Sequence, residues 1–154
     1  MASPTNFILD VDGVLTTGRF FYSSEGKRLK EFGPHDSDGL NLLRHQLAIS
    51  FITADELGFN ISRKRIVDDM GYPLRLAKEK DRLAFLSYNY DLQRTIYMGD
   101  GYHDAPILEI CHCGIAPNNA RIEAKRTADY ITPSNAGEGA VLDACLYIKE
   151  TFFD

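Results

Sequence analysis

Apolar runs of strand length alternate with helix-like segments along the chain, and this alternation limits the possible folds more than any other feature. The first run, Phe7 to Val11, is nearly continuous, which is typical of a strand covered on both faces. Further strands are expected at 48–53, 74–76, 95–98, 113–116 and 130–132, and helices at 39–46, 61–70, 82–90 and 139–152. Strands and helices in alternation predict an α/β fold, a Rossmann-like three-layer sandwich with a mainly parallel sheet.

One segment departs from this alternation. Residues 19–32 contain aromatic and alternating residues around Ser23-Ser24-Glu25-Gly26, which predicts a β-hairpin after the first strand. A chain of 154 residues without a linker or repeat favours one domain, so we expect a single domain over residues 1–154. Such a chain can bury a core without a disulfide or a structural metal.

Charge and cysteine content exclude several classes of protein. The net charge is -5 and the pI is about 5.3, so a nucleic-acid partner is not expected. The first residues carry neither a basic region nor a long apolar stretch, which predicts no secretory signal and no membrane span. The three cysteines include Cys111-His112-Cys113 but no second pair to complete a zinc site. We expect reduced thiols in a cytoplasmic protein.

Acidic and polar residues recur where predicted strands end. Asp10 and Asp12 end the first strand, Thr53 ends the second, and Asp100 and Asp104 follow the strand at 95–98. In open parallel sheets, ligands bind at this edge. Residues two apart on a strand share a face, so we expect the carboxylates of Asp10 and Asp12 to approach one point. Such a cluster requires a hard cation, and oxygen ligands favour Mg²⁺.

Three other interpretations fit these residues less well. A calcium-binding loop would need Asp or Asn at its fifth position and Gly at its sixth, where this chain has Val14 and Leu15. A dinucleotide fingerprint beginning at Gly99 would need a third glycine at position 104, which is Asp104. Turn capping explains one aspartate after a strand, but not acidic residues after two separate strands.

Taken together, these residues resemble the haloacid dehalogenase superfamily. The matching pieces lie in the family's order, each at a strand end, and cover nearly the whole chain. They are Asp10-Val11-Asp12-Gly13-Val14-Leu15-Thr16, Thr53, a basic residue near 82, and Gly99-Asp100-Gly101-Tyr102-His103-Asp104.

The resemblance implies a phosphatase with a covalent intermediate. Asp10 corresponds to the nucleophile that becomes an aspartyl phosphate, and Asp12 to the general acid and base. In the family, the carboxylates matching Asp10 and Asp100 and the backbone carbonyl matching Asp12 hold Mg²⁺. Asp104 would orient the basic residue or a metal-bound water.

The resemblance also implies which residues bind the phosphoryl group. Thr53 would donate a hydrogen bond to it, with Gly13 and Ala54 among the binding positions. The family places Lys, sometimes Arg, at the start of a later helix, where this chain has Asp81-Arg82-Leu83-Ala84. Arg82 is therefore the predicted basic residue, and Lys80 is the alternative.

Most members of the superfamily insert a cap domain, but residues 18–39 and 71–95 leave room only for a flap hairpin and no cap domain. Together with Gly137-Glu138-Gly139-Ala140-Val141 near the end, this is similar to the 3-deoxy-D-manno-octulosonate 8-phosphate phosphatase group and its relatives acting on nine-carbon sialic-type acid phosphates. The group forms homotetramers in which a neighbouring subunit covers the site, and we expect the same here.

Two arginines of that group are missing, which bears on the substrate. Thr53 is followed by Ala54-Asp55 where the group has Gly-Arg, and the later Gly-rich motif ends in Leu142-Asp143 where it has Arg-Glu. Arg is the usual partner of a carboxylate. A small phosphorylated sugar or sugar acid is the predicted substrate. The alternatives are another monoester, such as a nucleotide, or a non-catalytic module of the same fold, although the latter predicts a damaged Asp pair.

Overall fold

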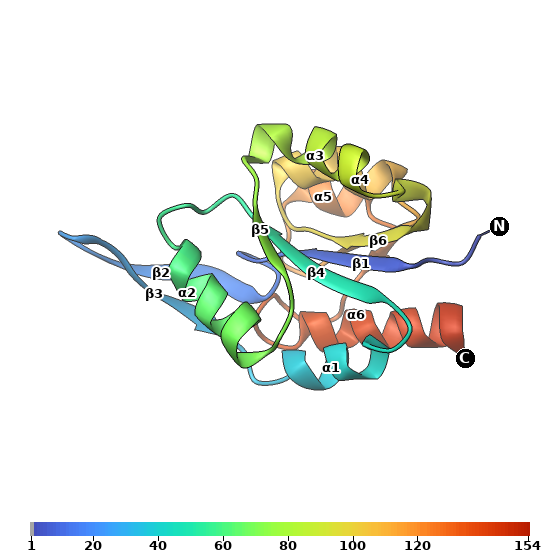
Figure 1. Ribbon diagram of the computed structural model, residues 1–154, viewed down its shortest axis with the longest axis horizontal. Coiled ribbons are helices and arrows are strands. Elements are labelled where there is room, and N and C mark those ends of the chain that lie inside the picture. The colour runs from blue at the N-terminus through green and yellow to red at the C-terminus, as the bar shows by residue number, and fades with distance from the viewer. Residues whose placement is uncertain (1) are drawn as a thin grey trace.

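A single parallel sheet forms the centre of the molecule. The computed structural model describes residues 2–154, and its sheet has the strand order β5-β4-β1-β6-β7-β8. Figure 1 labels the first four of these strands. The strands are β1 (Asn6–Asp10), β4 (Ala48–Thr53), β5 (Leu74–Leu76), β6 (Thr95–Met98), β7 (Cys113–Ala116) and β8 (Tyr130–Ile131). Every neighbouring pair is parallel. The predicted α/β class and parallel sheet are therefore confirmed.

Helices cover both faces of the sheet and bury its apolar side chains. Figure 1 shows α1 (Asp36–Leu43) and α6 (Ala140–Ile148) on one face, and α3 (Arg82–Asn89), α4 (Ala105–Ile110) and α5 (Ile122–Thr127) on the other. Successive residues of a strand point to opposite faces. Accordingly, Phe7 and Leu9 pack in the cluster with α1 and α6, while Ile8 packs in the cluster with α3, α4 and α5. This double burial explains the continuous apolar run of β1.

The predicted hairpin extends from one end of the sheet. It consists of β2 (Thr16–Ser23) and β3 (Gly26–Phe32), which are antiparallel, and we call residues 16–32 the flap hairpin. Beside it lies α2 (Phe59–Arg63), which continues as a π-helical turn over Lys64–Asp69 (Figure 1). Within residues 2–154, no domain is inserted after the flap hairpin or between β5 and β6. The chain therefore has a flap and no cap domain.

The helices differ from the sequence expectation in two respects. Helix α1 begins at Asp36 rather than at Gly39. The short helices α4 and α5 were not anticipated, because each has only six residues and therefore shows little periodicity.

The order of the strands creates a crevice beside β1. From β1 the chain proceeds outward to β4 and β5, then returns to β6 on the opposite side of β1. The connections after β1 and β6 therefore lead away from each other, which opens a crevice at the carboxyl ends of these strands. Asp10 and Asp100 stand at the two sides of this crevice.

The three cysteines lie in the interior of the fold. Cys111, Cys113 and Cys145 are buried and unpaired with one another. Burial raises the pKa of Cys111 and of Cys113 to about 12, so both thiols stay protonated near neutral pH. In the described part of the chain, no helix combines the length and the apolar character needed to cross a membrane.

Candidate active site

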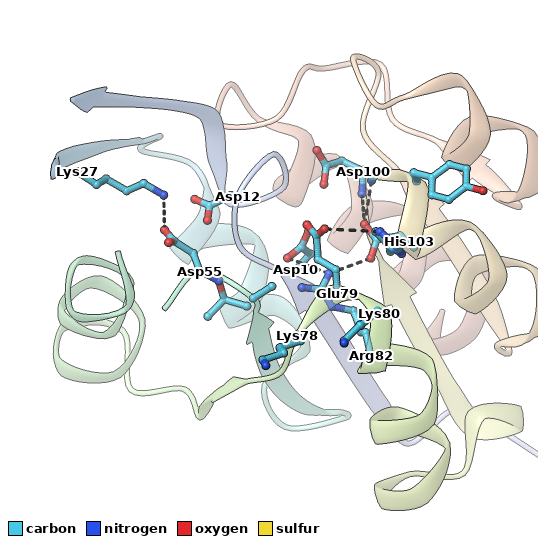
Figure 2. A pocket seen from close by; sticks show the side chains of 15 residues that line it. Asp10, Asp12, Lys27, Asp55, Lys78, Glu79, Lys80, Arg82, Asp100 and His103 are labelled. Carbon is cyan, nitrogen blue, oxygen red and sulfur yellow. Dashed lines mark hydrogen bonds and ion pairs between the residues drawn. The ribbon is translucent and has the colours of Figure 1, made fainter. Parts of the chain in front are cut away.

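Three carboxylates meet in the crevice beside β1. Asp10 ends β1, Asp100 follows β6, and Asp104 ends the 3-10 turn Tyr102–Asp104. Oxygen atoms from all three lie within 4.8 Å of one another. They line a cavity of about 620 Å³ that opens at the carboxyl ends of the strands (Figure 2). The sequence predicted this convergence of Asp10, Asp100 and Asp104.

A buried arginine balances part of this negative charge. The Arg82 Nη1 atom lies 3.3 Å from Asp10 Oδ1 and 3.0 Å from Asp104 Oδ1, and only 2% of Arg82 is exposed. Burial alone would lower the pKa of Arg82, but Asp10, Tyr97 and Asp104 together outweigh this effect and the pKa is raised. Arg82 is therefore a permanent cation in the site, placed there because it begins α3.

Asp104 binds both the backbone at Asp100 and the guanidinium of Arg82. Its Oδ2 accepts hydrogen bonds from the backbone N–H groups of Asp100 at 3.0 Å and Gly101 at 2.8 Å. Its Oδ1 accepts from Tyr97 Oη at 2.6 Å as well as from Arg82. Both oxygens of Asp104 are thus engaged by protein donors, whereas the carboxylates of Asp10 and Asp100 retain free lone pairs.

The electrostatics of this cluster fit a divalent cation. Burial raises the pKa of Asp10 well above its usual range despite the opposing charge of Arg82, with Asp104 and Asp100 raising it further. Burial and the charge of Asp104 raise the pKa of Asp100 to about 6. The single charge of Arg82 is therefore insufficient for the cluster. Carboxylate oxygens at this spacing suit a hard cation, with Asp10 and Asp100 as the candidate ligands.

Gly13 allows the loop after β1 to approach Asp100. Its φ of +83° is a backbone conformation that other residues rarely adopt, and a Cβ atom at this position would lie 1.9 Å from Asp100 Oδ2. Gly13 therefore leaves room for the carboxylate of Asp100 beside the loop that follows Asp10.

Asp12 does not join the carboxylate cluster. Its Oδ2 lies 2.9 Å from Lys30 Nζ, and its Oδ1 accepts a hydrogen bond of 3.3 Å from Thr16 Oγ1. The expectation that the carboxylates of Asp10 and Asp12 meet at one point is not met, because β1 ends at Asp10 and Asp12 already lies in the following turn. Asp12 nevertheless lines the same cavity (Figure 2).

Thr53 and Ala54 also line the cavity. Thr53 is 1% exposed, and its Oγ1 accepts a hydrogen bond of 3.1 Å from the backbone N–H of Asp55. Since the hydroxyl already accepts here, its own proton is available to a ligand in the cavity. Lys80 and Lys78 also line the cavity, but both side chains are exposed.

Three charged residues in or beside the cavity were not assigned to the site from the sequence. Lys27 and Lys30 of the flap hairpin lie 2.7 and 2.8 Å from Asp55 Oδ2. Burial would raise the pKa of Asp55, but the hydrogen bonds from Lys27 and Lys30 outweigh it and lower the pKa to about 2. The sequence pattern gave no indication of this network, because Lys30 is buried while the neighbouring Leu29 is 60% exposed.

Comparisons with known proteins identify the family. A family model for haloacid dehalogenase-like hydrolases matches residues 78–144. The 3-deoxy-D-manno-octulosonate 8-phosphate phosphatase of Haemophilus influenzae is 30% identical over 139 residues, which are 86% of this chain and 76% of that protein. The chain belongs to the haloacid dehalogenase-like phosphatases. The corresponding phosphatase of Escherichia coli K12 is 28% identical over 148 residues, or 90% of this phosphatase and 75% of the relative.

Solved structures show the same architecture. This phosphatase matches the cobalt-bound deoxy-D-mannose-octulosonate 8-phosphate phosphatase of Haemophilus influenzae with a TM-score of 0.81 and 27% identity, covering 96% of this chain and 88% of that one. The corresponding enzyme of Moraxella catarrhalis, in complex with a magnesium ion, a phosphate ion and 3-deoxy-D-manno-octulosonate (KDO), matches with a TM-score of 0.78 and 26% identity, covering 96% and 86%.

The role of Gly13 can be tested by adding one methyl group. Gly13→Ala should lower phosphatase activity by about 100-fold, because the new Cβ must displace Asp100 or the loop after β1. The measurement is the rate of phosphate release at increasing concentrations of divalent metal.

Gly18→Ala is the matched control for this test. Gly18 has a similar φ of +85°, but its Cβ would come no closer than 3.5 Å to Gly13. This variant should show only the strain of the backbone, about 1 kcal/mol of stability, and retain most of its activity. Equal losses of activity in the two variants would refute the steric role of Gly13.

Proposed function

We propose that this phosphatase hydrolyses a small phosphorylated sugar or sugar acid through an aspartyl-phosphate intermediate on Asp10. The observation that carries the proposal is the position of Asp10. It lies at the switch point of the sheet, with Oδ1 held by the backbone N–H of Val11 at 2.8 Å and by Arg82 at 3.3 Å. Its Oδ2 is the candidate attacking atom.

The reaction has two steps in which Asp12 moves the proton. In the first, Asp10 attacks phosphorus, the bond between phosphorus and the leaving oxygen breaks, and that oxygen takes a proton from Asp12. In the second, Asp12 takes a proton from water, the water oxygen attacks phosphorus, and the bond to Asp10 breaks. Inorganic phosphate leaves and both aspartates return to their starting states.

The phosphoryl oxygens are bound by residues from three elements. Arg82 supplies a fixed charge beside Asp10, and the free hydroxyl proton of Thr53 supplies a hydrogen bond. Gly13 and Ala54 contribute from the adjacent loops. Because Arg82 is buried against Asp10 while Lys80 is exposed, Arg82 is the stronger candidate for this role.

Mg²⁺ is the proposed cofactor, held by the carboxylates of Asp10 and Asp100 and the backbone carbonyl of Asp12. Its support is the cluster of acidic oxygens together with the raised pKa values of Asp10 and Asp100. When bound, the ion would neutralise charge that otherwise repels the phosphate from Asp10.

Two observations bear on the substrate. The relatives are phosphatases of an eight-carbon sugar acid phosphate, and a cavity of about 620 Å³ has the size of a small-molecule site. However, Asp55 occupies a position where that group has an arginine, and its charge is balanced by Lys27 and Lys30. Recognition of the carboxylate of a sugar acid substrate would therefore depend on other cations. Lys78, which lines the cavity, is a candidate.

A panel of phosphomonoesters tests this proposal. Phosphate release should require Mg²⁺, should be lost in Asp10→Asn because an amide is not a nucleophile, and should be faster for eight- or nine-carbon acid phosphates than for nucleotides. Faster turnover of a nucleotide would be consistent with the proposed phosphatase mechanism but would reject the proposed substrate class. Release by Asp10→Asn at the wild-type rate would reject the covalent mechanism.

We also propose that the enzyme is a homotetramer in which a neighbouring subunit covers the site. The support is the set of large side chains on the flap hairpin that are exposed in one chain, namely Phe20 at 48%, Phe21 and Tyr22 at 63% each and Leu29 at 60%. Clustered exposed apolar residues are typical of interfaces. Light scattering should give four times the mass of the chain, and a monodisperse monomer would contradict the proposal.

A further inference from the structure

Lys30 of the flap hairpin is a buried cation that faces the site from behind Asp12. Its side chain is fully buried, and its Nζ lies 2.9 Å from Asp12 Oδ2, 2.8 Å from Asp55 Oδ2 and 2.8 Å from Ser62 Oγ. An ammonium group has three protons to donate. The three acceptors can therefore engage all of them.

Burial of the Lys30 ammonium is energetically unfavourable, and a side chain with a purely structural role would not need the charge. A buried ammonium loses its hydration, and the attraction of paired carboxylates does little more than offset that loss. An apolar side chain at this place would fill the space at lower cost, and Leu29 next to it is left 60% exposed. The apolar Leu29 is exposed and the charged Lys30 is buried, which is the reverse of the usual arrangement. This reversal indicates a function for the ammonium at this position.

We propose that Lys30 is a positioning residue that fixes the carboxylate of Asp12 for proton transfer, and this inference rests on the acid and base role proposed for Asp12. The ammonium binds Oδ2 of Asp12, and an oxygen that accepts from an ammonium is a poor place for the transferable proton. The proton is therefore carried on Oδ1, which has only the longer 3.3 Å hydrogen bond from Thr16. Lys30 thus determines which carboxylate oxygen of Asp12 carries the transferable proton.

The same contacts link Asp12 to the flap hairpin. Lys30 belongs to β3, Asp12 to the loop after β1, Asp55 to the loop after β4, and Ser62 to α2. Displacement of the hairpin would carry the ammonium away from Asp12. The orientation of the acid is thereby coupled to the position of the flap hairpin.

The test compares two leaving groups in Lys30→Met. Phenyl phosphate needs a proton on its leaving oxygen, whereas nitrophenolate departs from p-nitrophenyl phosphate readily without one. We expect kcat/KM for phenyl phosphate to fall by about 10- to 100-fold and that for p-nitrophenyl phosphate by less than about 3-fold. Since kcat/KM reports only the steps through transfer to Asp10, the later hydrolysis does not mask the difference.

Two control variants separate the possible causes. Lys27→Met removes the same charge from the same hairpin and the same partner, Asp55, but Lys27 has no contact with Asp12 within bonding distance. It should change kcat/KM for both esters by a similar factor. Asp12→Asn should show the leaving-group dependence of Lys30→Met. If Asp12→Asn lacks that dependence, the acid role of Asp12 is wrong, and if only Lys30→Met lacks it, the positioning role of Lys30 is wrong.

A double-variant cycle gives a second measurement with any ester that the enzyme hydrolyses. Lys30→Met should lower kcat/KM no further once Asp12 is replaced by Asn, and additive losses would overturn the proposal. Should Lys30→Met fail to fold in thermal melting, Lys30→Arg keeps the charge, but its planar guanidinium cannot meet the same three acceptors. The arginine variant should show the same leaving-group dependence, and equal effects on both esters would overturn the proposal.

Discussion

The contact of one buried guanidinium with two carboxylates holds the active site together. Arg82 lies within 3.3 Å of both Asp10 and Asp104, while Asp100 adds a third carboxylate beside them. Without this cation, the burial of the cluster would be prohibitive. Despite this cation, burial and the neighbouring aspartates raise the pKa of Asp10 and of Asp100. The proposed divalent cation would add the positive charge that this cluster of carboxylates and an anionic phosphate ester both need.

The fold positions these groups through its strand order and through one glycine. Because β1 lies between β4 and β6, three loops converge at the carboxyl edge of the sheet. Gly13 permits the first loop to pass against Asp100, where any side chain would collide. Asp104 then uses both of its oxygens to fix the backbone at Asp100 and the guanidinium of Arg82. Each part of the site is thus oriented by a neighbouring element.

Much of this architecture could be predicted from the sequence, because it follows from local patterns. The continuous apolar run ending at Asp10 indicated a doubly covered strand, and Asp100 followed a second such run. Arg82 was singled out by the family resemblance rather than by a local pattern, and the structure places its guanidinium beside Asp10. The short helices α4 and α5 were missed, since six residues carry little periodicity.

The flap hairpin was harder to interpret than the sheet. Its position was predicted, but alternation would place Leu29 inward and Lys30 outward, and the structure has the reverse. The partners of Lys30 come from three separate loops or helices, Asp12, Asp55 and Ser62, and no local pattern joins them. Contacts of this kind depend on tertiary packing, which also turns the side chain of Asp12 away from Asp10.

The identity of the nucleophile is the most direct test of this mechanism. Acid quenching during turnover, followed by proteolysis and mass spectrometry, would locate a phosphoryl group on the protein. The predicted result is one phosphoryl group on the peptide that contains Asp10, present with Mg²⁺ and substrate and absent from Asp10→Asn. A phosphoryl group on a different residue would contradict the assignment of Asp10.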